Sequence, residues 1–107
     1  WRKRPDCCLV NFYREGAKMG LHRDADEGTF EAPVVSISLG DQGLFRIGGA
    51  VRKDPTQTIT LNSGDVLVMG GPSRLAYHGV DRIEFGSSPL LKDGGRINIT
   101  LRVVEGC

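Results

Sequence analysis

The stretch 20–27, GLHRDADE, places an imidazole and two carboxylates two residues apart, at His22, Asp24 and Asp26. Successive side chains of an extended strand point to opposite faces, so these three groups would lie on the same face. Two carboxylates brought together in this way need a cation or a hydrogen-bonding substrate beside them, unless all three groups are solvated. The stretch therefore indicates either a metal or substrate site or an ordinary charged surface.

The chain contains only two histidines, His22 and His78, and His78 lies in another segment of strand character, 75–80. Two histidines and one carboxylate that leave three coordination positions open form the facial triad of non-haem Fe(II) oxygenases. An isolated His-x-Asp is weak evidence, because such pairs are common at surfaces. A second histidine in a strand strengthens the hypothesis of an Fe(II) site formed by His22, Asp24 and His78, with O2 and a co-substrate at the open positions.

The segment 96–104, RINITLRVV, alternates strictly between polar and aliphatic residues. One face carries Arg96, Asn98, Thr100 and Arg102, and the other face is aliphatic. An exposed antiparallel strand with one solvated face would show the same pattern. Alternatively, the two arginines line a polar cavity that receives a carboxylate, because the guanidinium fork matches a carboxylate bidentately and stays charged when partly buried.

The segment 7–13 repeats this arrangement, with Asn11 and Tyr13 on one face and Val10 and Phe12 on the other. Asn11 and Tyr13 are uncharged hydrogen-bonding residues that could complete an anion pocket. The alternative is that Tyr13 is a half-buried aromatic residue with its hydroxyl at the surface.

Short segments rich in Val, Ile, Leu, Thr and aromatic residues alternate with turn signals such as NSGD and KDGG. No window shows the 3.6-residue period of a helix, so little helix is expected. Many short strands joined by Gly-rich turns indicate an all-β fold, a jelly roll or barrel, in one domain over 1–107. The predicted strands are 7–13, 33–39, 43–49, 57–62, 65–71, 75–80 and 96–104.

Bulk properties restrict the function only weakly. The formal net charge is +1 and the pI is about 7.9, which does not indicate a nucleic-acid-binding protein. Basic residues at 2–4 and 52–53 could form a local basic rim or simply a solvated surface. No apolar run is long enough for a transmembrane helix, and no signal peptide is evident, so no membrane partner is expected.

The ends and the cysteines suggest a fragment of a cytoplasmic protein. The chain begins with Trp1 rather than Met, so upstream sequence is expected. The three cysteines, Cys7, Cys8 and Cys107, are an odd number, which argues against a disulfide framework and fits a reducing cytoplasm.

Together these motifs carry a resemblance. The series NFY, GAKMGLHRDADE, APVVSISLG, SGDVLVMGGPSRLAYHGV and RINITLR resembles the bacterial AlkB family of Fe(II)/2-oxoglutarate-dependent nucleic-acid demethylases. The similarity extends from about residue 5 to residue 102. It implies a double-stranded β-helix, or jelly-roll, core. It also implies that His22, Asp24 and His78 are the iron ligands.

The resemblance assigns further roles. Asp26 matches the acidic residue that contacts the exocyclic amino group of the methylated base, and Arg52 matches a basic residue at the substrate pocket, although Lys53 leaves that register open by one. Met69 departs from the family, where a Trp is frequent. The residues that match the 2-oxoglutarate contacts are Asn11, Tyr13, Arg96, Asn98 and Arg102.

The reaction implied by the resemblance is oxidative demethylation of 1-methyladenine and 3-methylcytosine with Fe(II), 2-oxoglutarate and O2, yielding succinate, CO2 and formaldehyde. The expected partner is alkylated single-stranded DNA or a base flipped from a duplex, with RNA as a further substrate. A monomer is expected. The family's N-terminal nucleotide-recognition lid lies upstream of these residues.

Two other functions remain open at this point. One is a 2-oxoglutarate-dependent hydroxylase of a protein or small molecule, and the other is a non-enzymatic jelly-roll binding module.

Overall fold

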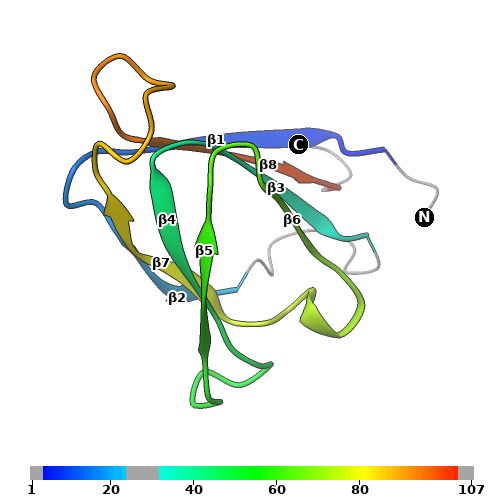
Figure 1. The fold of residues 1–107 in the computed structure, drawn as a ribbon. Helices are drawn as coiled ribbons and strands as arrows, with labels where there is room; N and C mark the ends of the chain where they lie inside the picture. Colours follow the sequence, from blue (N-terminus) through cyan, green and yellow to red (C-terminus); the bar gives the residue numbers. More distant parts are fainter. Residues whose placement is uncertain (1–3, 24–31, 104–107) are drawn as a thin grey trace.

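The computed structural model describes residues 4–23 and 32–103, and almost all of its regular structure is β (Figure 1). No α-helix occurs in these two ranges, and a single 3₁₀ turn, η1, spans Gly71–Ser73. The eight strands are β1 (Cys7–Tyr13), β2 (Met19–His22), β3 (Val34–Gly40), β4 (Gln42–Ile47), β5 (Gln57–Leu61), β6 (Val66–Met69), β7 (His78–Glu84) and β8 (Arg96–Arg102).

The strands form two four-stranded antiparallel sheets that face each other (Figure 1). Sheet A has the order β1-β8-β3-β6 and sheet B the order β2-β7-β4-β5. The chain therefore passes from one sheet to the other at most connections, and the first and last strands are neighbours in sheet A. Two facing antiparallel sheets with eight strands in total form a jelly roll, so the predicted fold class is confirmed.

Three strand predictions need correction. β2 is a strand that the list of predicted segments lacked, because it has only four residues, one of them Gly20. The predicted strand 75–80 begins instead at His78 and continues to Glu84, because its exposed charged residues hide the apolar alternation. The predicted strand 65–71 ends at Met69, since Pro72 and the positive φ of Gly71 start the 3₁₀ turn.

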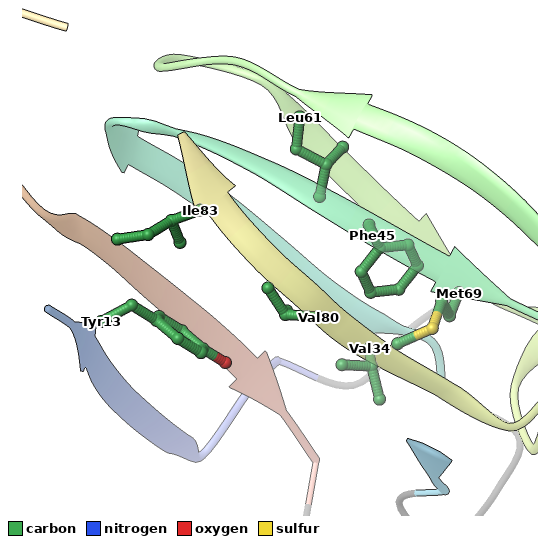
Figure 2. Close-up of a cluster of buried hydrophobic side chains, with 7 residues drawn as sticks. All are labelled: Tyr13, Val34, Phe45, Leu61, Met69, Val80 and Ile83. Carbon is green, nitrogen blue, oxygen red and sulfur yellow. The ribbon is translucent and has the colours of Figure 1, made fainter. Parts of the chain in front are cut away.

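The core is a small apolar cluster between the two sheets (Figure 2). Six of the eight strands contribute to it, which ties the sheets together at many points along the chain. Its buried members are Tyr13, Val34, Phe45, Leu61, Met69, Val80 and Ile83.

Part of the inner face of sheet A is polar, unlike the inner face of an ordinary sandwich layer. On β3, Ser36 and Ser38 are buried on the inner face, while the aliphatic residues that alternate with them are half-buried on the outer face. On the edge strands, Val10 and Val68 remain 58% and 54% exposed on that outer face. The inner polar residues therefore leave room in the interior for a polar cavity rather than a closed apolar core.

The β3–β4 turn is held by a buried carboxylate. Asp41 accepts backbone hydrogen bonds from Gly86 (2.9 Å), Ser88 (2.9 Å) and Gly95 (2.7 Å). These three donors lie in the long connection from β7 to β8, so Asp41 fixes that loop against the start of β4. Burial of the carboxyl group raises its pKa, but these backbone donors outweigh burial, and the pKa of Asp41 lies below its ordinary value.

Replacing Asp41 by Asn is expected to destabilise the fold by about 2–4 kcal/mol, because one carboxylate oxygen becomes an NH2 group that faces backbone donors. The folded-state pKa is depressed, so the stabilisation is present above the unfolded pKa of about 3.8 and is lost as pH falls through the folded value. Urea unfolding at pH 7 and at successively lower pH checks this. The difference between wild type and Asp41→Asn should narrow below about pH 4; a constant difference would contradict the assignment.

The structure also tests the expectations about membrane-spanning helices and about the cysteines. Within the described ranges no helix is long or apolar enough to cross a bilayer. Cys7 on β1 is disulfide-bonded, whereas Cys8 is a free and exposed thiol. The odd number of cysteines therefore did not exclude a disulfide.

Candidate active site

The two histidines meet between adjacent strands of sheet B. In the β2–β7 ladder His22 lies directly opposite His78, and their ring centroids are 4.5 Å apart. Residues 56 positions apart in sequence are thus brought to the distance at which two imidazoles can bind one ion. His78 is buried and stacks on the Phe45 ring at a centroid distance of 5.7 Å, while His22 is half-buried.

Each imidazole is oriented by a backbone carbonyl two residues earlier in the chain. The Nδ1 atom of His22 lies 3.0 Å from the oxygen of Gly20, and that of His78 lies 3.0 Å from the oxygen of Ala76. A carbonyl oxygen only accepts, so Nδ1 is the donor in both rings, and in a neutral imidazole this leaves the lone pair on Nε2. Fixing the tautomer in this way is the usual preparation of a metal-binding histidine.

Gly79 allows the two histidine strands to approach closely. A Cβ atom at position 79 would lie 2.6 Å from the carbonyl oxygen of Met19 on β2. A side chain here would push β2 away from β7 and separate the two imidazoles. Sequence reasoning missed this glycine, because the contact is visible only once β2 is paired with β7.

The third predicted metal ligand, Asp24, and the predicted base contact, Asp26, both lie outside the described residues. Among residues 4–23 and 32–103, no group of three or more His, Cys, Asp or Glu side chains gathers around a common point.

A cavity of about 130 Å³ opens beside the histidines, between the two sheets. Compared with the volume that one ordered water needs, this cavity has room for on the order of ten water-sized groups. The polar face of β8 lines the cavity, so the alternative of an exposed, solvated strand is wrong. The residues of sheet A that line the cavity are Leu9, Asn11, Tyr13, Val34, Ser36, Met69, Arg96, Asn98, Thr100 and Arg102.

Arg96 is the most unusual group in the cavity wall. Its side chain is only 1% exposed, yet within residues 4–23 and 32–103 the buried Nε and Nη1 atoms have no hydrogen-bond partner. Burial lowers the pKa of Arg96, an effect that Tyr13 partly opposes, but a guanidinium still carries its charge near neutral pH. A buried cation with two unused donors costs several kcal/mol unless an anion pairs with it. The cavity is therefore built for a carboxylate or similar anion at this point.

Neutral hydrogen-bonding groups surround the guanidinium. Tyr13 lies opposite Arg96 in the β1–β8 ladder, with the guanidinium carbon 5.9 Å from its ring centroid. Its hydroxyl contacts the sulfur of Met19 at 3.9 Å, and burial raises its pKa, while the charge of Arg96 acts in the opposite direction. Tyr13 therefore stays protonated and can donate to an anion.

Asn98 is held in a fixed orientation by its neighbours. The Ser36 hydroxyl donates to its Oδ1 atom (2.6 Å), and its Nδ2 atom donates to the Thr100 hydroxyl (3.2 Å). Asn11 lies directly opposite Asn98 in the β1–β8 ladder and also lines the cavity. The cavity wall thus carries preorganised amide and hydroxyl groups around one buried cation.

Gly43 on β4 is a second glycine that sequence reasoning missed. A Cβ atom there would lie 2.9 Å from the Nε atom of Arg96, on the opposite sheet. The absence of a side chain at position 43 therefore provides the space in which the guanidinium lies.

Replacing Gly43 by Ala should move the Arg96 guanidinium and weaken binding of a dicarboxylate about ten-fold, comparable to losing one hydrogen bond to a charged group. Metal affinity should be unchanged, because neither histidine touches Gly43. Calorimetric titration with 2-oxoglutarate and, separately, with a divalent metal checks both parts. Equal weakening of both ligands would indicate general misfolding instead.

Arg52 lies at the rim rather than in the cavity wall. Its Nη1 atom donates to the carbonyl oxygen of Leu21 (3.0 Å), next to His22. Met69, where the family resemblance expected a Trp, is buried and lines the cavity. The structure therefore places the predicted residues in three groups: the histidine pair, the polar cavity wall and the rim.

These side chains fit a metal ion and an anionic co-substrate. Two imidazoles with unprotonated Nε2 atoms suit a divalent transition metal. The buried Arg96 suits a carboxylate, which one end of 2-oxoglutarate would supply.

Comparison with known proteins agrees with this arrangement. Residues 2–102 match the 2OG-Fe(II) oxygenase superfamily. An "Alpha-ketoglutarate-dependent dioxygenase AlkB homolog" of Caulobacter vibrioides is 64% identical over 98 residues, covering 92% of this chain and 44% of the relative. "DNA N(6)-methyladenine demethylase ALKBH1C" of Arabidopsis thaliana is 44% identical over 108 residues, covering 92% and 24%. The solved structure titled "The structure of OsALKBH1" superposes with a TM-score of 0.84 at 44% identity, covering 94% and 50%.

The chain belongs to the 2OG-Fe(II) oxygenase superfamily. Within that superfamily, the predicted resemblance to bacterial AlkB proteins is confirmed. The chain spans less than half the length of the curated relatives described above.

Proposed function

We propose that this chain is the catalytic part of a 2-oxoglutarate-dependent dioxygenase that removes N-methyl groups from nucleic-acid bases, with 1-methyladenine and 3-methylcytosine in DNA as substrates and RNA as a further one. The observation that carries the proposal is Arg96: a buried guanidinium with two unused donors at the base of a cavity beside a histidine pair.

In this proposal His22 and His78 bind Fe(II) through their Nε2 atoms, and Asp24 is the third ligand. Bound Fe(II) and 2-oxoglutarate supply the oxidation of the N-methyl group by O2, with release of succinate, CO2 and formaldehyde. Arg96 pairs with the far carboxylate of 2-oxoglutarate.

The other polar residues position the co-substrate. Tyr13 donates its hydroxyl proton to a carboxylate oxygen, and Asn11, Asn98 and Arg102 complete the wall. These groups are oriented before binding, so little entropy is lost when the co-substrate enters. The aliphatic and aromatic residues around them keep water from the reacting atoms.

Asp26 is proposed to accept a hydrogen bond from the exocyclic amino group of the methylated base. Asp26→Ala should therefore change the preference between methylated adenine and cytosine. Unchanged base preference would show that this role of Asp26 is wrong.

Product analysis tests the proposal. The protein is incubated with Fe(II), 2-oxoglutarate, O2 and single-stranded oligonucleotides that carry 1-methyladenine, 3-methylcytosine or no methyl group. Succinate and formaldehyde should appear in equal amounts with the methylated strands only. Succinate without formaldehyde from any strand would redirect the function to a protein or small-molecule hydroxylase. No succinate and no metal uptake would overturn the enzymatic function.

A further inference from the structure

Two arginines gather on one tyrosine ring at the end of sheet B that carries the histidines. The guanidinium carbon of Arg52 lies 4.9 Å from the Tyr77 ring centroid, and that of Arg23 lies 5.5 Å from it. Arg23 directly follows His22 and Tyr77 directly precedes His78, so the pairing of the two histidines brings these neighbours together. We call Arg23, Arg52 and Tyr77 the rim cluster.

Backbone hydrogen bonds hold the rim cluster in place. Gly48 donates to the carbonyl oxygen of Tyr77 (2.8 Å), and Tyr77 donates to that of Gly49 (2.9 Å). The turn that carries Arg52 is closed by the Val51 N–H, which donates to the carboxylate of Asp54 (3.1 Å). Arg52 also reaches the carbonyl oxygen of Leu21, so three separate chain segments are joined before any ligand arrives.

The cluster carries two positive charges that are not balanced by its described neighbours. Arg23 and Arg52 are both exposed, and among the described residues neither lies within ion-pair distance of a carboxylate. The face of the Tyr77 ring attracts each guanidinium but carries no net charge. A pair of guanidinium groups on a rigid support fits a phosphate, which takes bidentate hydrogen bonds from such groups.

The position of the cluster favours the backbone of a nucleic acid over its base. Arg23 directly follows the last residue of β2 and Tyr77 directly precedes the first residue of β7, and neither side chain lines the cavity beside the histidines. A base in the cavity would therefore leave its flanking phosphates outside, over this rim.

We propose that Arg23 and Arg52 bind a phosphate that flanks the target base in single-stranded nucleic acid, and that Tyr77 is the positioning residue that holds both guanidinium groups. This inference rests on the proposed function and deepens it. It adds Arg23 to the substrate-binding residues, gives Tyr77 a positioning role, and moves Arg52 from the base to the backbone.

The test is the salt dependence of binding to a methylated single-stranded oligonucleotide. Fluorescence anisotropy is measured with Fe(II) and 2-oxoglutarate present and O2 excluded, so that no turnover occurs. Each lost phosphate contact should reduce the slope of log affinity against log salt by about 0.7. Because both guanidinium groups bind one phosphate, the double variant Arg23→Gln/Arg52→Gln should lose this slope in full. Arg23→Gln and Arg52→Gln alone should each lose part of it and bind about three- to ten-fold more weakly at low salt.

Two further variants separate charge from position. Tyr77→Leu should weaken binding about two- to five-fold without changing the salt slope, since both charges remain. Tyr77→Phe keeps the ring and should bind as wild type. Lys92→Gln is the matched control, because it removes one exposed charge in the β7–β8 loop, at the opposite end of the molecule from the β4–β5 loop that carries Arg52 (Figure 1).

The outcomes distinguish this inference from the function on which it rests. If wild type binds and demethylates the strand but Arg23→Gln and Arg52→Gln keep its affinity and slope, the rim cluster does not bind phosphate. If Lys92→Gln loses as much slope as they do, the effect is non-specific and the inference also fails. If wild type neither binds nor demethylates, the proposed function itself fails.

Discussion

Replacing Arg96 by Met is expected to weaken 2-oxoglutarate binding by several orders of magnitude while leaving the protein folded. The buried Nε and Nη1 atoms of Arg96 have no hydrogen-bond partner among the described residues, so a carboxylate would gain two charge-assisted hydrogen bonds. At about 1.5–3 kcal/mol for each such bond, their loss should weaken binding by about 10²–10⁴-fold. Methionine is similar in length and apolar, so it removes a buried charge without creating a large void.

The stability of this variant makes the prediction specific. An arginine that served the fold would destabilise the protein strongly when removed, whereas an arginine awaiting a ligand should leave the free energy of unfolding unchanged or raised. Calorimetric titration with 2-oxoglutarate and urea unfolding without it measure the two quantities. Arg96→Lys is the matched variant, because it keeps the charge, loses the planar fork and should bind with intermediate affinity. Undiminished 2-oxoglutarate affinity in Arg96→Met would refute the assignment.

The sequence predicted those parts of the site that depend on alternation along one strand. The polar and aliphatic faces of 96–102 were evident, but alternation alone cannot say which face points inward. The structure decides this because β8 lies between β1 and β3, and the inner residues of β3 that pair with Thr100 and Asn98 are Ser36 and Ser38. Two polar inner faces can only enclose a polar cavity. The sequence favoured an inward-pointing polar face for residues 96–102 only when the histidine pattern was considered as well.

Close approaches between distant segments could not be predicted. The need for glycine at position 43 arises from Arg96, which lies 53 positions later, and the need at position 79 arises from the backbone of β2. Neither requirement leaves a signal in its own segment. The rim cluster is similar, because Tyr77 looks like an ordinary strand residue until Arg23 and Arg52 converge on it.

Replacing His78 by Ala is expected to abolish metal binding. Removing a residue that only hydrogen-bonds to a metal ligand lowers metal affinity about 10–100-fold, so removing a ligand itself should lower it further. His78 is buried, has its tautomer fixed by the carbonyl oxygen of Ala76, and lies opposite His22. His22→Ala should have the same effect. The double variant should be no worse than either single variant, because residues that act as one unit are not additive.

Divalent-metal titration of the four proteins, wild type included, measures this. Loss of the buried His78 ring also removes packing on Phe45, so a control must disturb the same cavity without removing a ligand. Met69→Leu does so by a swap of similar volume in the cavity wall, and it should bind the metal as wild type does. If His78→Ala retained wild-type metal affinity, or if the two histidine variants were additive, the histidines would not bind one ion. The arrangement at His22 and His78 would then be a packing feature of sheet B.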